Sequence, residues 1–216
     1  MSTIAAPVKS GAGNARAALR IGPLTGLLFA GLLLAVRVIE GNGLPDATDS
    51  TSSVVSYWTS NRSSQMLVAV LASFAAVCLV WYAGTLRSAL ARAEGGSATL
   101  ANISFGGAVL AAVGALATTT VEYAAAHSAG HVPAQVTQTL SVLQADTFLP
   151  IAAGFAVFGL AAGLAVVRTK ALPTKLGWLS VGAGVLWLTP GEFVAIFLSV
   201  IFVAISAVML YREREQ

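Results

Sequence analysis

Long apolar stretches alternate with shorter polar segments along the whole chain. The apolar stretches are approximately Ile21–Ile39, Met66–Leu86, Ile103–Ala125, Phe148–Val167, Pro173–Leu188 and Phe193–Leu210. A helix needs about 20 mainly apolar residues to cross a hydrocarbon core of about 30 Å. The pattern therefore predicts an all-α polytopic transmembrane helix bundle with six spans.

The last two of these spans come from one apolar run, from Leu176 to Tyr211. As a single helix this run would be about 54 Å long, far more than one crossing requires. The sequence Thr189-Pro190-Gly191-Glu192 lies inside it, and Pro-Gly is a turn signal. We expect the chain to turn there; if it does not, the bundle has five spans.

Two of the polar segments between spans contain short helical patterns, and we expect both helices to lie at the membrane interface on the outer face. In the first segment, Asp49 or Thr51 is placed to cap a helix that carries Tyr57 and Trp58. Tyrosine and tryptophan favour the membrane–water interface.

The second of these polar segments begins a helical pattern at Pro133. Val136, Leu140 and Leu143 follow at a spacing that places them on one face of a helix. We expect this face to be the apolar side of an amphipathic helix.

The basic residues give the direction of insertion. All of the 12 Lys and Arg residues except Arg37 and Arg62 fall on one side of the six-span arrangement. Cytoplasmic loops carry an excess of Lys and Arg, so we expect both termini in the cytoplasm of a bacterial cell and the bundle in its inner membrane. Residues 1–20 are then a flexible cytoplasmic tail, 21–211 one transmembrane domain and 212–216 a short C-terminal tail.

Composition agrees with a membrane environment. Charged residues make up 10% of the chain, compared with about 25% in soluble domains, and the mean hydropathy is +0.81. The sequence pI near 9.4 does not indicate nucleic-acid binding, because no basic face with interleaved aromatic residues is present. The lipid bilayer is therefore the expected partner, and a homo-oligomer or a membrane complex is a further hypothesis.

Glycines recur within the later spans, including the pair Gly159 and Gly163 and the residues Gly177 and Gly184. Small residues let transmembrane helices approach closely. They can hold one bundle together or form a homo-oligomer interface, and the sequence leaves both interpretations open.

Several polar residues gather at the expected outer ends of the spans: Arg37, Glu122, His127, His131, Asp146 and Glu192. The simplest interpretation is that loops and helix ends need polar residues; an aspartate such as Asp146 suits a helix N-terminus. A second is an ion pair between Arg37 and either Glu122 or Glu192, since an arginine in a span needs a partner.

The third interpretation is a metal or proton site at the two histidines. His127 and His131 are four residues apart, so on a continuous helix they would share a face. Glu122 does not share that face, and a further ligand would have to come from Asp146 or Glu192. The pair matches no recognised metal motif, and no cofactor is expected.

The segments SVVSYWTSNRSSQ, WYAGTLRSAL and LPTKLGWLSVGAGVLWL resemble an uncharacterised family of bacterial multi-pass membrane proteins of the domain-of-unknown-function type. The resemblance covers most of the chain after the N-terminal tail. It implies a six-helix inner-membrane protein and assigns no catalytic residue or substrate.

Together these patterns predict a non-enzymatic integral membrane protein: a small transporter-like, channel-like or accessory subunit. The alternative is an outer-face membrane enzyme or pH sensor that depends on a metal or on His127 and His131. Histidine titrates near neutrality, so a sensor would respond between about pH 5 and 8.

Overall fold

The computed structural model describes residues 11–40, 44–46 and 48–213, and for residues 11–20 and Glu192 it describes the backbone alone. The described residues are helical and contain no strand. The helices are α1 (Gly11–Glu40), α2 (Thr51–Ser60), α3 (Arg62–Glu94), α4 (Thr99–Ser128), α5 (Ala134–Asp146), α6 (Leu149–Thr169), α7 (Thr174–Leu186) and α8 (Glu192–Arg212). The predicted all-α class is confirmed.

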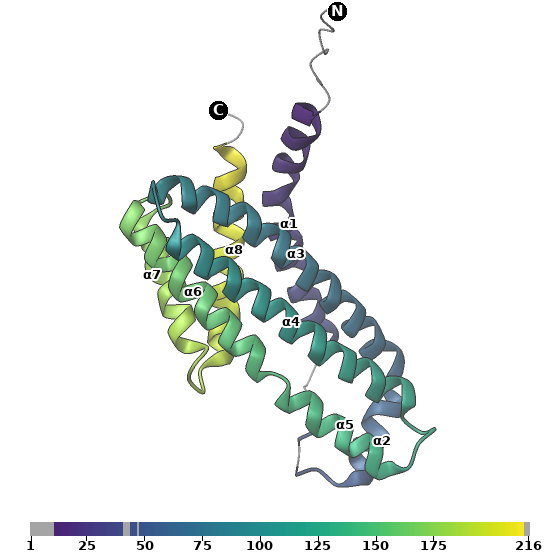
Figure 1. Ribbon diagram of the computed structural model, residues 1–216. Helices are drawn as coiled ribbons and strands as arrows, with labels where there is room; N and C mark the ends of the chain where they lie inside the picture. Colours follow the sequence, from purple (N-terminus) through teal and green to yellow (C-terminus); the bar gives the residue numbers. More distant parts are fainter. Residues whose placement is uncertain (1–10, 41–43, 47, 214–216) are drawn as a thin grey trace, which may run out of the picture.

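Five long helices and the shorter α7 pack side by side in a closed ring (Figure 1). Around the ring, α1 packs on α3, α3 on α4, α4 on α6, α6 on α7, α7 on α8, and α8 again on α1. The described start of α1 and the end of α8 lie at the same end of the molecule (Figure 1). We call this the terminal end and the opposite one the distal end.

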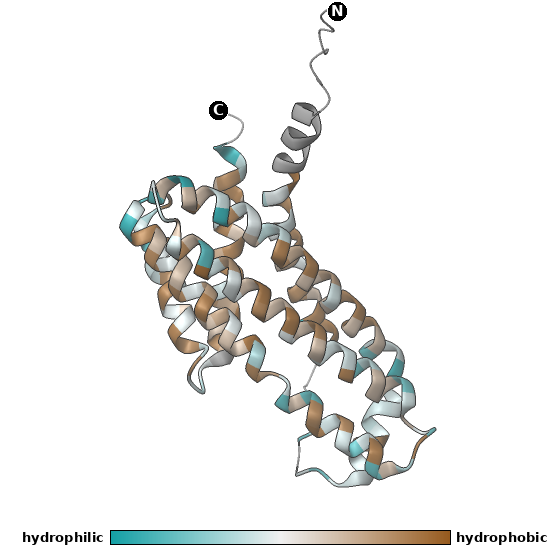
Figure 2. Cartoon of the chain, viewed as in Figure 1, coloured by the Kyte–Doolittle hydropathy of each residue, from teal (hydrophilic) through white to brown (hydrophobic). Residues whose placement is uncertain are grey.

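Five helices among the described residues are long and apolar enough to cross a membrane. They are Ile21–Glu40, Arg62–Glu94, Thr99–Ser128, Ala134–Thr169 and Phe193–Arg212. Hydrophobic residues run along these helices, while hydrophilic ones gather at the two ends of the molecule (Figure 2). The chain therefore has the construction of a multi-pass membrane protein.

The expected break in the last apolar run is present, because α7 ends at Leu186 and α8 begins at Glu192. Helix α7 has 13 residues, so it is only about 20 Å long and shorter than a full crossing. The expected fifth span is thus a short helix in the structure.

Helix α1 begins at Gly11, not at Ile21, and residues 11–20 continue the same helix. Alanine and arginine are strong helix formers, and they are frequent in this segment. Pro23 consequently lies inside the helix, not in its first turn as expected. The rest of the expected flexible tail, residues 1–10, lies outside the described residues.

The ring is held by close backbone approach at glycines. A Cβ atom at Gly163 of α6 would lie 2.6 Å from the Gly177 carbonyl oxygen of α7. One at Gly107 of α4 would lie 2.4 Å from the backbone nitrogen of Phe158 in α6. These glycines serve packing within one chain, which is the first of the two interpretations left open by the sequence.

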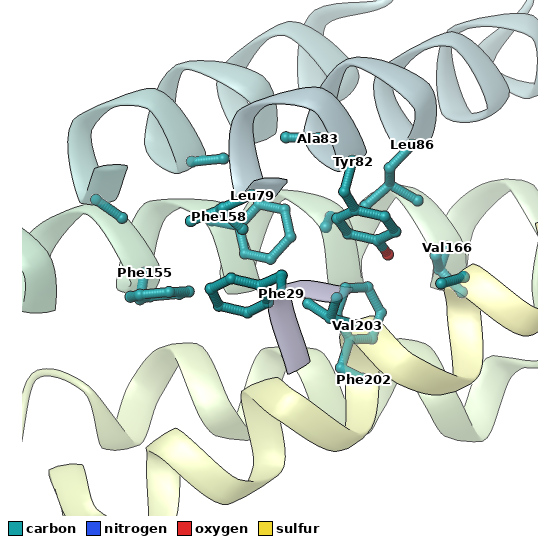
Figure 3. Packing of buried hydrophobic residues seen from close by; sticks show 14 of the residues in the cluster. Phe29, Leu79, Tyr82, Ala83, Leu86, Phe155, Phe158, Val166, Phe202 and Val203 are labelled. Atoms are coloured by element: carbon teal, nitrogen blue, oxygen red, sulfur yellow. The ribbon is translucent and has the colours of Figure 1, made fainter. Parts of the chain in front are cut away.

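The ring has a solid centre filled by large side chains (Figure 3). Phe29 of α1, Tyr82 of α3, Phe155 and Phe158 of α6, and Phe202 of α8 are all buried there. Phe158 packs edge-on against Phe202, with ring centroids 6.0 Å apart. The axis of the ring is therefore occupied by aromatic residues.

Beyond the ring, helices α2 and α5 and the adjoining ends of α3 and α4 form a smaller bundle at the distal end, which we call the distal cap (Figure 1). It has its own apolar cluster, in which Val54 and Trp58 of α2 pack against Ala125, Ala126 and Ala129 at the end of α4. Both short helices predicted from the sequence exist, at residues 51–60 and 134–146.

The buried face of α2 differs from the one expected, and that of α5 is polar. Trp58 is 0% exposed, so it packs inward instead of marking a surface aromatic belt. On α5, Val136 and Leu143 are exposed while Thr137 and Gln144 are buried. The exposed side of α5 is thus the apolar one, as on the predicted amphipathic helix, whereas the side packed in the distal cap carries polar residues.

Candidate functional site

Glu122 of α4 is a buried carboxylate in the distal cap. Its side chain is 3% exposed, and its Oε1 atom has no hydrogen-bond partner in the protein. The α4 sequence TTTVEYAAAH places it one helical turn after Thr119, on the same buried face. A charged group buried in this way is costly unless something compensates it.

Gln65 lies at the N-terminal end of α3 and is 2% exposed. Its Nε2 atom donates to the hydroxyl of Tyr57 over 2.7 Å, while its Oε1 atom has no partner. Burial, and then the nearby carboxylates of Glu40 and Glu122, raise the pKa of Tyr57. The three helices α2, α3 and α4 thus bring a phenol, an amide and a carboxylate into one region.

Two further buried polar atoms in the distal cap lack a partner. They are the indole Nε1 of Trp58 on α2 and the hydroxyl oxygen of Thr137 on α5. Together with Gln65 and Glu122 they are all the buried side-chain polar atoms without a hydrogen bond among the described residues. Sequence reasoning identified Glu122 but missed the other three, because a Trp, Gln or Thr in a cap helix has no motif.

Arg37 forms an ion pair with Glu40 on its own helix, with Nη1 and Oε2 2.8 Å apart. The expected ion pair between Arg37 and Glu122 is not formed. Residues three apart on a helix are neighbours, so Glu40 neutralises the charge of Arg37 from within α1. The side chain of Arg37 is also 45% exposed, so it does not need a partner on another helix. Arg37 nevertheless remains within electrostatic reach of Glu122.

The two histidines do not share a helix face. His127 stacks on Tyr123, one turn earlier in α4, with ring centroids 6.0 Å apart. Helix α4 ends at Ser128, and Gly130 has a φ of +77°, so His131 belongs to the turn that follows. Within the described residues, no three His, Cys, Asp or Glu side chains gather in a way that could hold a metal ion.

His131 instead contacts Arg62, the first residue of α3. The Nη1 atom of Arg62 lies 3.2 Å from His131 Nε2. The same guanidinium donates to the carbonyl oxygens of Ala126 and Ala129 at the end of α4. Arg62 therefore satisfies carbonyl groups that a helix C-terminus leaves unpaired, and its charge suits the helix dipole there.

The remaining two residues of the expected outer cluster are placed differently. Asp146 is exposed and ends α5, whereas α6 begins at Leu149 after Phe148, so Asp146 does not cap α6. The side chain of Glu192 lies outside the described residues. In the same way Ser50, and not Asp49 or Thr51, caps α2 by accepting from the backbone of Ser53.

Comparison of this chain with protein-family models, with curated proteins and with solved structures finds no match. The resemblance to an uncharacterised bacterial membrane family stays a prediction. The function must therefore be argued from the packing of the ring and from the polar groups of the distal cap.

Proposed function

We propose that this chain is a non-enzymatic accessory or scaffold protein of a bacterial inner membrane, with both termini in the cytoplasm. The observation that carries the proposal is the filled centre of the helix ring (Figure 3). A channel or transporter needs a polar path along its axis. Here the axis holds Phe29, Phe155, Phe158 and Phe202.

Several polar groups inside the ring are hydrogen-bonded between helices. The hydroxyls of Tyr82 and Ser206 are hydrogen-bonded to each other between α3 and α8. Ser180 of α7 donates to the Gly159 carbonyl of α6 over 2.9 Å, and Trp187 Nε1 donates to Ser199 of α8 over 2.9 Å. Such bonds hold the helices in one arrangement and engage these polar groups in packing.

A sixth crossing made by α7 is part of the proposal. Helices α6 and α8 both run towards the terminal end, so α7 and the turn after it must bring the chain back. Exposed Leu188 and Phe193 flank that turn, which suits a hairpin whose tip stays in contact with lipid. Three basic residues lie around the connection from α6 to α7, where the positive-inside rule puts cytoplasm: Arg168 in the last turn of α6, Lys170 in the loop and Lys175 at the start of α7.

The test is a flux measurement on the full chain in proteoliposomes. A potential-sensitive dye would report K⁺, Na⁺ and H⁺ movement, with protein-free vesicles as the control. We expect the same leak with and without protein. A flux that depends on the protein and disappears in Glu122→Gln would overturn the accessory role and support a transporter.

A further inference from the structure

A pocket of about 310 Å³ opens at the terminal end, between the end of α3, the loop after α6 and the end of α8. Two charged residues line it, Arg92 in the last turn of α3 and Glu213 directly after α8, and both are exposed. Its lining also includes four leucines that are at most 4% exposed: Leu86, Leu90, Leu172 and Leu210. The pocket therefore has an apolar floor and two opposite charges at its mouth.

The two charges at the mouth do not neutralise each other. Among the described residues, the ion pair between Arg37 and Glu40 is the single one formed, so Arg92 and Glu213 share the pocket without pairing. The other acid that the structure describes at this end, Glu94, accepts from the backbone of the first turn of α4. Glu213 is thus the described carboxylate at this end that a ligand in the pocket can reach.

The pocket lies where a membrane surface is expected. Helices α3 and α8 are both long and apolar enough to cross a membrane, and the pocket is formed where they end. Hydrophilic residues gather at this end of the molecule (Figure 2). Tyr211, next to the pocket residue Leu210, is 38% exposed and is of a type that favours the membrane–water interface. The pocket is therefore level with the headgroups of phospholipids, which bind in basic pockets between transmembrane helices.

We propose that this pocket binds the headgroup of one ethanolamine phospholipid. The phosphate accepts from the guanidinium of Arg92, and the ammonium donates to the carboxylate of Glu213. The leucines of the floor contact the apolar part of the lipid next to its headgroup. A headgroup that carries only negative charge would meet Glu213 as a like charge, so the amine distinguishes the ligand.

This inference does not depend on the accessory role, because binding at the terminal end requires no path through the ring. It is tested by native mass spectrometry of the full chain in detergent with equal amounts of dioleoyl phosphatidylethanolamine and dioleoyl phosphatidylglycerol. The two lipids have the same acyl chains, so the ratio of the single-lipid adducts reports the headgroup. We expect the ethanolamine lipid to exceed the glycerol lipid about threefold, as for an exposed ion pair.

Arg92→Gln tests the phosphate contact. Both lipids have a phosphate, so the occupancy of both adducts should fall about threefold. Lys175→Gln is the matched control, because it removes one exposed cation at the same end from a residue that does not line the pocket. Its adducts should equal those of the native protein.

Glu213→Arg tests the amine contact by reversing the charge. The glycerol lipid should now exceed the ethanolamine lipid. Asp146→Lys is the matched control, since it makes the same change in charge at an exposed position outside the pocket and should keep the native ratio. The side chains at positions 92, 146, 175 and 213 are all exposed, so each variant should fold.

The proposal is overturned if the native protein takes up the glycerol lipid as readily as the ethanolamine lipid, or more readily. It is also overturned if Glu213→Arg keeps the native ratio or if Arg92→Gln keeps the native occupancy. O-phosphoethanolamine, the free headgroup, separates the lipid from a soluble ligand. If it binds at the same concentration as the lipid, the occupant is a soluble zwitterion and the lipid assignment is wrong.

Discussion

The hydroxyl groups of Tyr82 and Ser206 are hydrogen-bonded in the middle of the helix ring and join α3 to α8. Both side chains are fully buried, and Ser206 also donates towards the Phe202 and Val203 carbonyls one turn earlier in its own helix. The two partners are therefore not equivalent. Ser206 has other acceptors on its own helix, whereas the Tyr82 hydroxyl has Ser206 alone among the described residues.

This asymmetry predicts that Ser206→Ala is more damaging than Tyr82→Phe. The phenylalanine removes a hydroxyl and leaves Ser206 bonded to its own helix, at a cost of about 0.5–1.5 kcal/mol. The alanine leaves a buried phenol without a partner, at a cost of about 1–3 kcal/mol. Thermal unfolding in detergent measures both, and a lower Tm for Tyr82→Phe than for Ser206→Ala would contradict the geometry.

The contact between α6 and α7 gives a second prediction. In Gly163→Ala the new Cβ atom would lie 2.6 Å from the Gly177 carbonyl oxygen, so the helices must separate. We expect a loss of roughly 1–3 kcal/mol, as for other overpacked contacts. The measurement is the Tm, together with the yield of monodisperse protein after extraction.

Gly182→Ala on α7 is the matched control for this contact. No other atom lies within 4 Å of the position that its Cβ would take. Alanine is the better helix former, so the Tm should stay the same or rise slightly. If both variants lose stability equally, the close approach of α6 and α7 is not what holds these helices together.

Much of the fold follows from the sequence because hydropathy dictates which segments enter the membrane. The long helices and the break before Glu192 could be predicted from apolar length and from Pro190-Gly191 alone. The orientation of α5 could not, because its buried face carries Thr137, Ser141 and Gln144, which a hydrophobic pattern assigns to solvent. The residues of α2 and α4 that pack against α5 determine which of its faces is buried.

The candidate site was predicted less well than the fold. Glu122 stood out as an acid in an apolar run, but its neighbours Gln65 and Trp58 come from helices distant in sequence. The histidines were identified by spacing alone, but α4 ends at Ser128, between them, and Gly130 follows with a positive φ. Arg37 pairs with Glu40, three residues later on the same helix, and not with an acid on another helix.

Arg62 provides a third prediction, because it connects the start of α3 to the end of α4. In Arg62→Ala the carbonyls of Ala126 and Ala129 lose their donor, so the last turn of α4 should open more often. Hydrogen exchange should increase for residues 125–129, while exchange in α6 and α8 stays the same. Arg62→Lys should restore part of the protection, since it keeps the charge near the helix C-terminus but not the fork of donors.

Cysteine labelling tests the orientation proposed for the chain, because the protein has a single native cysteine. Cys78 is buried, so a membrane-impermeant maleimide should not label the native protein. Ser56→Cys places a thiol on the exposed side of α2 in the distal cap, and Gly96→Cys places one in the exposed loop between α3 and α4. With both termini in the cytoplasm, intact cells should be labelled at position 56 alone, and position 96 should react only after the membrane is permeabilised. The reverse pattern would show the opposite insertion, and labelling of both positions in intact cells would mean that α3 does not cross the membrane.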